Sequence, residues 1–169
     1  MEKFKDIHIL RWEEIPDFPL YIDQVITLIE KSLSFLSEEK GEKIITSTMI
    51  NNYVKNGIVE APIKKRYTRS QVAYFIVICL YKRVYSLDEI AHMIQIQLEN
   101  SKLEIAYNNF CNIFENLLKD VYEQKDLFSD KKITDIFHKT IISVVFKVYI
   151  QSYLLEKFPS EEKSKKKKS

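Results

Sequence analysis

The chain has 169 residues, 46% of them hydrophobic, which suits one domain or one small domain with a helical extension. It contains two glycines, and because sheets, tight hairpins and phosphate-binding loops rely on glycine, a mostly helical protein is favoured. The net charge of +2 excludes little, but residues 43–87 contain eight Lys or Arg and one acidic residue, whereas acidic residues outnumber basic ones in the remainder. This segregation predicts a basic segment that faces a polyanion.

The first 19 residues show no clear periodicity and contain two prolines. We expect them to form an arm that packs on the core through four apolar side chains, those of Ile7, Ile9, Leu10 and Trp12. Apolar residues at helical spacing then predict a first helix from about residue 20 to 36, and a polar, glycine-containing loop follows it.

A short second helix is predicted to begin at Thr46 or Ser47, since either hydroxyl can cap the free amides of a first turn. It is expected to end at Asn56-Gly57, a typical helix stop. Ile58-Val59 and Lys65-Arg66-Tyr67 are then candidate strands of a small hairpin, although no glycine marks its turn.

Four further helices are predicted. Thr68 or Ser70 is expected to cap an almost entirely apolar helix that runs to about residue 83 and lies in the core. Ser86 with Glu89 forms a capping box for the next helix. A long helix from about residue 99 to a break at Ser129-Asp130 and a last helix over 132–158 complete the pattern.

The chain lacks the patterns typical of enzymes, metal sites and membrane spans. Cys79 and Cys111 lie in apolar helical patterns without CxxC spacing, which indicates two buried thiols in a reduced compartment. The three histidines share no ligand spacing, and no Walker-type loop, GxSxG or HExxH motif occurs. The longest apolar run has ten residues, about half the ~20 that a membrane helix needs. We expect a cytoplasmic protein that is not an enzyme and uses no metal or cofactor.

Residues 47–59, 65–68 and 85–90 together resemble the DNA-binding domain of the mercury-resistance-regulator (MerR) family. That family has a recognition helix ending in Tyr-x-x-x-Gly-Leu, a wing with an Arg-x-Tyr-like element and a later helix opening with Ser-Leu-x-Glu-Ile. The matching residues are Tyr53, Gly57, Ile58, Arg66, Tyr67, Ser86, Leu87, Glu89 and Ile90. The resemblance implies a winged helix-turn-helix that binds DNA. From residue 20 through the helix after Ser86, the chain is also similar to an uncharacterised family of Gram-positive bacterial proteins, catalogued as a domain of unknown function, which implies no activity.

Two sets of side chains are candidates for DNA contact. Asn51 and Asn52 are candidate base-reading residues, because an Asn amide can pair with the N6/N7 edge of adenine. An exposed helix surface with one Asn near a cap explains them equally well. The candidate phosphate contacts, which position a protein without reading sequence, are Thr48, Lys55, Lys64, Lys65, Arg66 and Arg69. A solvated basic face is the alternative for the cations, and the scarcity of nearby acids favours polyanion contact.

We therefore expect a mainly α protein with an arm (1–19), a winged helix-turn-helix-like domain (20–97), two long helices for dimerisation or effector binding (98–158) and a disordered lysine-rich tail (159–169). The expected function is transcriptional regulation by a homodimer on duplex DNA, with a possible effector of unknown identity. Two alternatives stay open. One is a helical protein–protein interaction adaptor without DNA binding, and the other is a helical protein that binds a small hydrophobic ligand.

Overall fold

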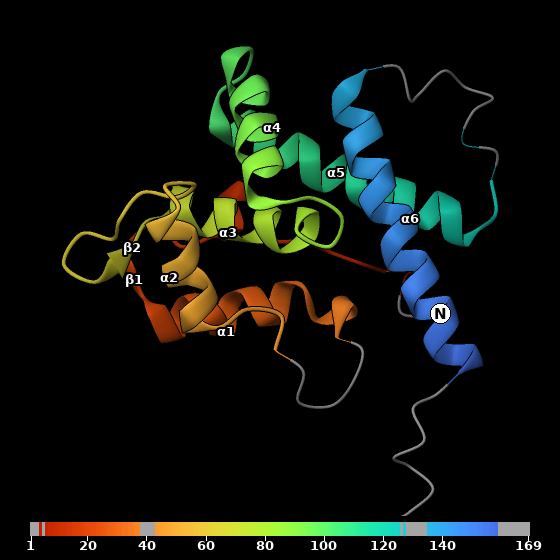
Figure 1. Cartoon of the computed structure of the whole chain (residues 1–169), viewed down its shortest axis with the longest axis horizontal. Coiled ribbons are helices and arrows are strands. Elements are labelled where there is room, and N and C mark those ends of the chain that lie inside the picture. The colour runs from red at the N-terminus through yellow and green to blue at the C-terminus, as the bar shows by residue number, and fades with distance from the viewer. Residues whose placement is uncertain (1–3, 5, 38–42, 126, 128–134, 159–169) are drawn as a thin grey trace, which may run out of the picture.

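The structure is a computed structural model that describes residues 4, 6–37, 43–125, 127 and 135–158 (Figure 1). The described residues are mainly helical, as the sequence predicts. The helices are α1 (Ile22–Ser32), α2 (Ser47–Lys55), α3 (Arg69–Tyr81), α4 (Leu87–Glu99), α5 (Leu103–Tyr122) and α6 (Ile136–Lys157). Two-residue strands β1 (Leu20–Tyr21) and β2 (Arg66–Tyr67) and short 3-10 turns at Trp12–Glu14 and Ser34–Leu36 are the other regular elements in these ranges.

Three predicted helix starts are confirmed by their caps. The Thr46 hydroxyl accepts a hydrogen bond from the Met49 amide at the start of α2. Thr68 and Ser86 begin α3 and α4 with reciprocal capping boxes, in which a side chain three residues later returns a hydrogen bond to the cap amide. At the other end of α2, Gly57 adopts a φ of 72°, the left-handed conformation that favours glycine at a helix stop.

Helix α3 lies at the centre of the molecule, where it contacts α1, α4, α5 and α6 (Figure 1). Nine of its thirteen residues are buried, in agreement with its apolar sequence. The buried side chains form one cluster that extends from Phe4 in the arm to Val148 in α6. The helices before and after α3 therefore share a hydrophobic core.

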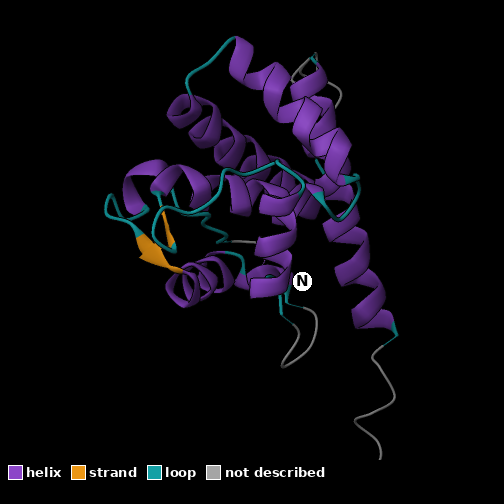
Figure 2. Ribbon diagram, turned by 60° about the vertical axis from the view of Figure 1, so that its left-hand side comes forward, coloured by secondary structure: helices purple, strands orange, loops and turns teal. Residues whose placement is uncertain are grey.

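The strand pairing differs from the predicted hairpin of 58–59 with 65–67. Strand β2 instead pairs antiparallel with β1, so that Leu20 lies opposite Tyr67 and Tyr21 opposite Arg66, and Figure 2 shows this small sheet at one edge of the molecule. The backbone of residues 58–60 has other partners. The Ile58 amide donates to the Tyr53 carbonyl at the end of α2 (3.1 Å), and the Glu60 carbonyl accepts from the Gln71 side chain (2.9 Å).

A tight turn nevertheless exists at the predicted tip. Ile63 and Arg66 exchange both backbone hydrogen bonds, with N···O distances of 3.1 and 3.0 Å. The two residues between them, Lys64 and Lys65, have φ values of 50° and 61°. Positive φ at both central residues defines a type I′ turn, which normally carries Asn and Gly. Two lysines thus adopt a backbone conformation that side chains disfavour.

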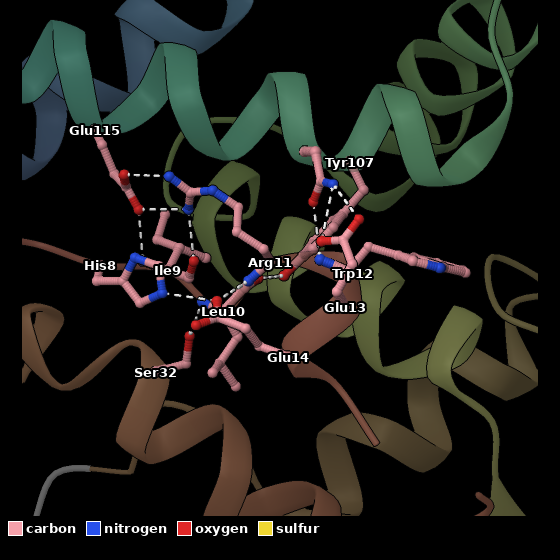
Figure 3. A network of polar contacts seen from close by, with 11 residues as sticks. His8, Ile9, Leu10, Arg11, Trp12, Glu13, Glu14, Ser32, Tyr107 and Glu115 are labelled. Atoms are coloured by element: carbon pink, nitrogen blue, oxygen red, sulfur yellow. Dashed lines mark hydrogen bonds and ion pairs between the residues drawn. The ribbon is translucent and has the colours of Figure 1, made fainter. Parts of the chain in front are cut away.

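The N-terminal arm packs through the apolar residues that the sequence predicts and is fastened to α5 by polar contacts (Figure 3). Arg11 makes two hydrogen bonds to the Glu115 carboxylate, of 2.7 and 2.6 Å, and the Ile9 amide donates a third of 2.6 Å. The Tyr107 hydroxyl donates to the Leu10 carbonyl (2.6 Å). The arm therefore joins the beginning of the chain to α5.

The last two helices are shorter than predicted. Helix α5 ends at Tyr122, and α6 begins after Asp135, whose carboxylate caps the His138 amide. The predicted break at Ser129-Asp130, the predicted helix start at residue 132 and the tail 159–169 lie outside the described residues. None of the helices in the described ranges combines the length and the apolar character that a membrane crossing requires.

Candidate nucleic-acid interface

Four of the predicted contact residues form one exposed stripe along α2. Thr48, Asn51, Asn52 and Lys55 are exposed, whereas Ile50 and Tyr53 on the other side of the helix are buried. The four positions follow the i, i+3, i+4, i+7 spacing of a single helix face. With a rise of ~1.5 Å per residue, the stripe is about 10 Å long, and the ~10–12 Å diameter of an α-helix fits the ~12 Å width of a DNA major groove.

The two asparagines of the stripe have different surroundings. The Asn56 side-chain amide donates to both the backbone carbonyl (2.7 Å) and the side-chain oxygen (3.0 Å) of Asn52, so Asn52 helps to close the end of α2. The Asn51 side chain makes no hydrogen bond to any residue that the structure describes. Because its whole carboxamide is available, Asn51 is the stronger candidate for base reading.

The tight turn of residues 63–66, here called the basic hairpin, carries three adjacent exposed cations, those of Lys64, Lys65 and Arg66. The Arg66 guanidinium donates to the Tyr21 hydroxyl (2.7 Å) and lies 4.7 Å from the centroid of the Tyr21 ring. Both side chains are exposed, and the pairing of β1 with β2 places them opposite each other. Tyr21 was not among the predicted site residues, because its sequence neighbours indicate a helix.

Arg69 differs from the other predicted phosphate contacts. Its Nε donates to the Ile15 carbonyl (2.8 Å), and its guanidinium lies 5.7 Å from the centroid of the Trp12 ring. The side chain is partly buried. Arg69 therefore connects the arm to the start of α3, a structural contact that the sequence did not indicate.

Other cations of the basic segment point to internal partners. Lys82 donates to the Tyr53 hydroxyl (3.2 Å) from above that ring, and Lys43 forms an ion pair with Glu30 (3.3 Å). Arg83 donates to the Gln151 side chain of α6 (2.8 Å). Lys43 and Lys82 are exposed as well, so the exposed cations of the segment without a hydrogen bond or ion pair to a described residue are Lys55, Lys64 and Lys65. Figure 1 shows α2 and the hairpin at the same end of the molecule.

The histidines and cysteines, for which the sequence predicts no metal site or disulfide, have the following surroundings. His8 contacts Glu14 (2.7 Å) and His138 contacts Asp135 (3.0 Å), and no group of three metal-ligating side chains occurs within the described ranges. Cys79 and Cys111 are buried free thiols, and burial raises the pKa of each to about 12. At neutral pH these thiols are protonated and poorly nucleophilic.

Comparison with known proteins gives one finding. The family model described as a domain of unknown function (DUF1836) matches residues 10–114. The chain belongs to the DUF1836 family. The matched DUF1836 region runs from the arm through α4 into α5, so it contains both the α2 stripe and the basic hairpin. No curated protein and no solved structure shows a significant match.

Proposed function

We propose that the chain binds duplex DNA, with α2 directed at a groove and the basic hairpin at the adjacent phosphates, as part of a transcriptional regulator. The observation that carries the proposal is the exposed stripe of Thr48, Asn51, Asn52 and Lys55, together with the basic hairpin at the same end of the molecule. A helix with one polar, exposed face is the element that usually reads a major groove.

The helix starts near this surface also suit phosphate. Neither α2 nor α3 has an acidic residue in its first turn, so nothing in those turns opposes the partial positive charge of the free backbone amides. Thr48 adds a hydroxyl in the first turn of α2. Glu60 is the one acidic residue between Lys43 and Leu87.

The proposal predicts a definite dependence on salt. Setting aside Arg69, which has a structural contact, leaves four candidate cations: Lys55, Lys64, Lys65 and Arg66. Each neutralised phosphate contributes roughly −0.9 to the slope of log K against log salt concentration, so four contacts give about −3.6 for each bound subunit.

A double substitution at the turn separates charge from folding. Lys64→Asn with Lys65→Gly supplies the residues that a type I′ turn prefers, so the hairpin should be retained while two cations are removed. The matched control is Lys139→Gln with Lys147→Gln, which removes two exposed cations from α6. Fluorescence anisotropy with a labelled duplex, from 50 to 200 mM salt, measures the slope for each protein.

We expect the turn variant to lose affinity and its slope to become shallower by about two units per subunit, whereas the α6 control keeps the parent slope. Asn51→Ala should keep the slope and lose the sequence preference found by selection from a random duplex library. If the folded parent protein does not bind duplex DNA at about 50 mM salt, or if the two double variants have the same slope, DNA binding through the hairpin is wrong. The better-supported function would then be that of a protein–protein interaction adaptor.

The regulator proposal includes a homodimer. One small helix gives limited specificity alone, and a two-fold pair reads two half-sites. Helix α6 has an apolar stripe in which Phe146, Ile150, Tyr153 and Leu154 are between 37% and 51% exposed. These positions lie on one helix face, and the same stripe on a second copy can cover them across a two-fold axis.

A further inference from the structure

An apolar pocket lies where α3, α4 and α5 meet the start of α6. The enclosed part of the pocket has a volume of about 50 Å³, and the space including the open mouth is about 440 Å³. Five aromatic rings contribute to its wall, those of Tyr74, Tyr81, Tyr107, Phe110 and Phe137. The other lining residues are aliphatic except for Gln97. Among the described residues, no charged side chain lines the pocket, so this wall does not suit an anion or a cation.

The pocket exists because α4 is incompletely packed. Ile90 is the buried residue of this thirteen-residue helix, and the side chains of Met93, Ile94 and Leu98 that face α3 and α5 stay partly exposed. Protein interiors are normally close-packed, and wall atoms without neighbours lose dispersion energy. A small apolar molecule in the pocket would supply these missing contacts.

The polar groups of the wall define the rest of the ligand. The Tyr81 hydroxyl hydrogen-bonds to the Thr140 hydroxyl (3.1 Å), and the Tyr107 hydroxyl donates to the Leu10 carbonyl (2.6 Å). These bonds hold both rings in place and use their hydroxyls. The Gln97 carboxamide makes no hydrogen bond to any described residue, so it can pair with a polar group on a ligand.

We propose that this pocket binds a small aromatic molecule with one hydrogen-bonding substituent, of the phenol or indole class. The aromatic wall accepts a ring edge-on or offset, and Gln97 pairs with the hydroxyl or N–H. A helix from another protein does not fit, because an α-helix with side chains is ~10–12 Å across. The inference goes beyond DNA binding and does not depend on it.

The test uses the full chain and isothermal titration with p-cresol, indole and toluene as probes. Ala106 lines the pocket on α5, and Ala106→Met places a longer apolar side chain inside it. Ala91 lies on α4 outside the lining, so Ala91→Met is the matched control. We expect p-cresol and indole to bind the parent protein, Ala106→Met to weaken p-cresol by about tenfold or more, and Ala91→Met to leave its affinity unchanged.

A second variant covers the case in which Ala106→Met does not fold. Gln97→Leu removes the hydrogen-bonding group from the partly exposed face of α4. The parent protein should prefer p-cresol over toluene by roughly fivefold, the effect of one hydrogen bond, and Gln97→Leu should abolish that preference. Failure of p-cresol and indole to bind the parent protein up to their solubility limits overturns the proposal. So does an unchanged preference in Gln97→Leu, or unchanged p-cresol affinity in a folded Ala106→Met.

Discussion

Replacing Glu115 by Gln removes the charge that fastens the N-terminal arm to α5 (Figure 3). Its carboxylate accepts two hydrogen bonds from Arg11 and one from the Ile9 amide, all between 2.6 and 2.7 Å. The hydrogen bond to Glu115 raises the pKa of Arg11, so Arg11 stays charged at every pH at which the protein folds. In Glu115→Gln this cation loses its counter-charge, and one acceptor oxygen becomes a donor.

The magnitude follows from the burial of the pair. Hydrogen bonds to charged groups contribute about 1.5–3 kcal/mol, and breaking a fully buried ion pair costs about 3–5 kcal/mol. The Arg11 and Glu115 side chains are 21% and 16% exposed, which places the pair below the fully buried limit. We expect a loss of about 2–3 kcal/mol. For a protein of this size each kcal/mol lowers the unfolding temperature by about 2–4 °C, so the expected decrease is roughly 4–12 °C.

Urea denaturation at pH 7 measures the loss, and a double-mutant cycle with Arg11→Met isolates the pairwise term. The coupling between the two positions should exceed about 1 kcal/mol. The matched control is Glu123→Gln, which removes a carboxylate from an exposed ion pair with Lys125 (2.7 Å) and should leave the unfolding temperature unchanged. A zero coupling energy, or equal stability of Glu115→Gln and the parent, would refute the inference that this ion pair fastens the arm to α5.

Three further predictions concern assembly, the thiols and acid stability. Ile150→Glu with Leu154→Glu should convert a homodimer into a monomer of ~20 kDa, measured by light scattering at micromolar concentration, because an interface burying over ~1,000 Å² does not tolerate charges at its centre. Cys79 and Cys111 should react with a disulfide reagent at pH 8 only as fast as the protein opens, since burial raises the pKa of both to about 12. Asp135→Asn should flatten the loss of stability in acid.

The sign of the last effect follows from linkage. The hydrogen bond from the His138 amide lowers the pKa of Asp135 in the folded state. The stability it contributes is therefore fully present above the unfolded pKa of about 3.9 and is lost as pH falls through the lower folded value. Asn keeps the cap but does not titrate there. The control is denaturation at pH 7, and equal pH profiles for the two proteins would refute the argument.

The predictions for the dimer and for the two thiols can also be refuted directly. A monomeric parent protein at micromolar concentration would remove the dimer. Rapid modification of Cys79 or Cys111 in protein shown to be folded would contradict their burial. Urea-unfolded protein gives the reference rate for an accessible thiol.

The sequence by itself determined the local structure of this protein. The cap at Thr46, the capping boxes at Thr68 and Ser86, and the stop at Gly57 all follow from interactions between residues at most five apart. Such contacts are present in each segment before it packs, so their residue types can be recognised without knowledge of the fold. The apolar sequence of α3 likewise indicated its burial, because a helix that is hydrophobic all round has no face for solvent.

The tertiary structure decided which residues far apart in the sequence contact each other. Leu20 pairs with Tyr67, Arg69 donates to Ile15 and Arg11 binds Glu115 over separations of up to 104 residues. Such contacts depend on how the helices stack, and a strand of two residues has no periodicity to mark it. The same holds for the pocket, whose wall comes from four helices. Sequence patterns therefore indicated the stripe on α2 and the cations of the hairpin. Only packing showed that Arg69 and Lys82 contact Trp12 and Tyr53, and that Arg66 lies beside the exposed Tyr21 ring.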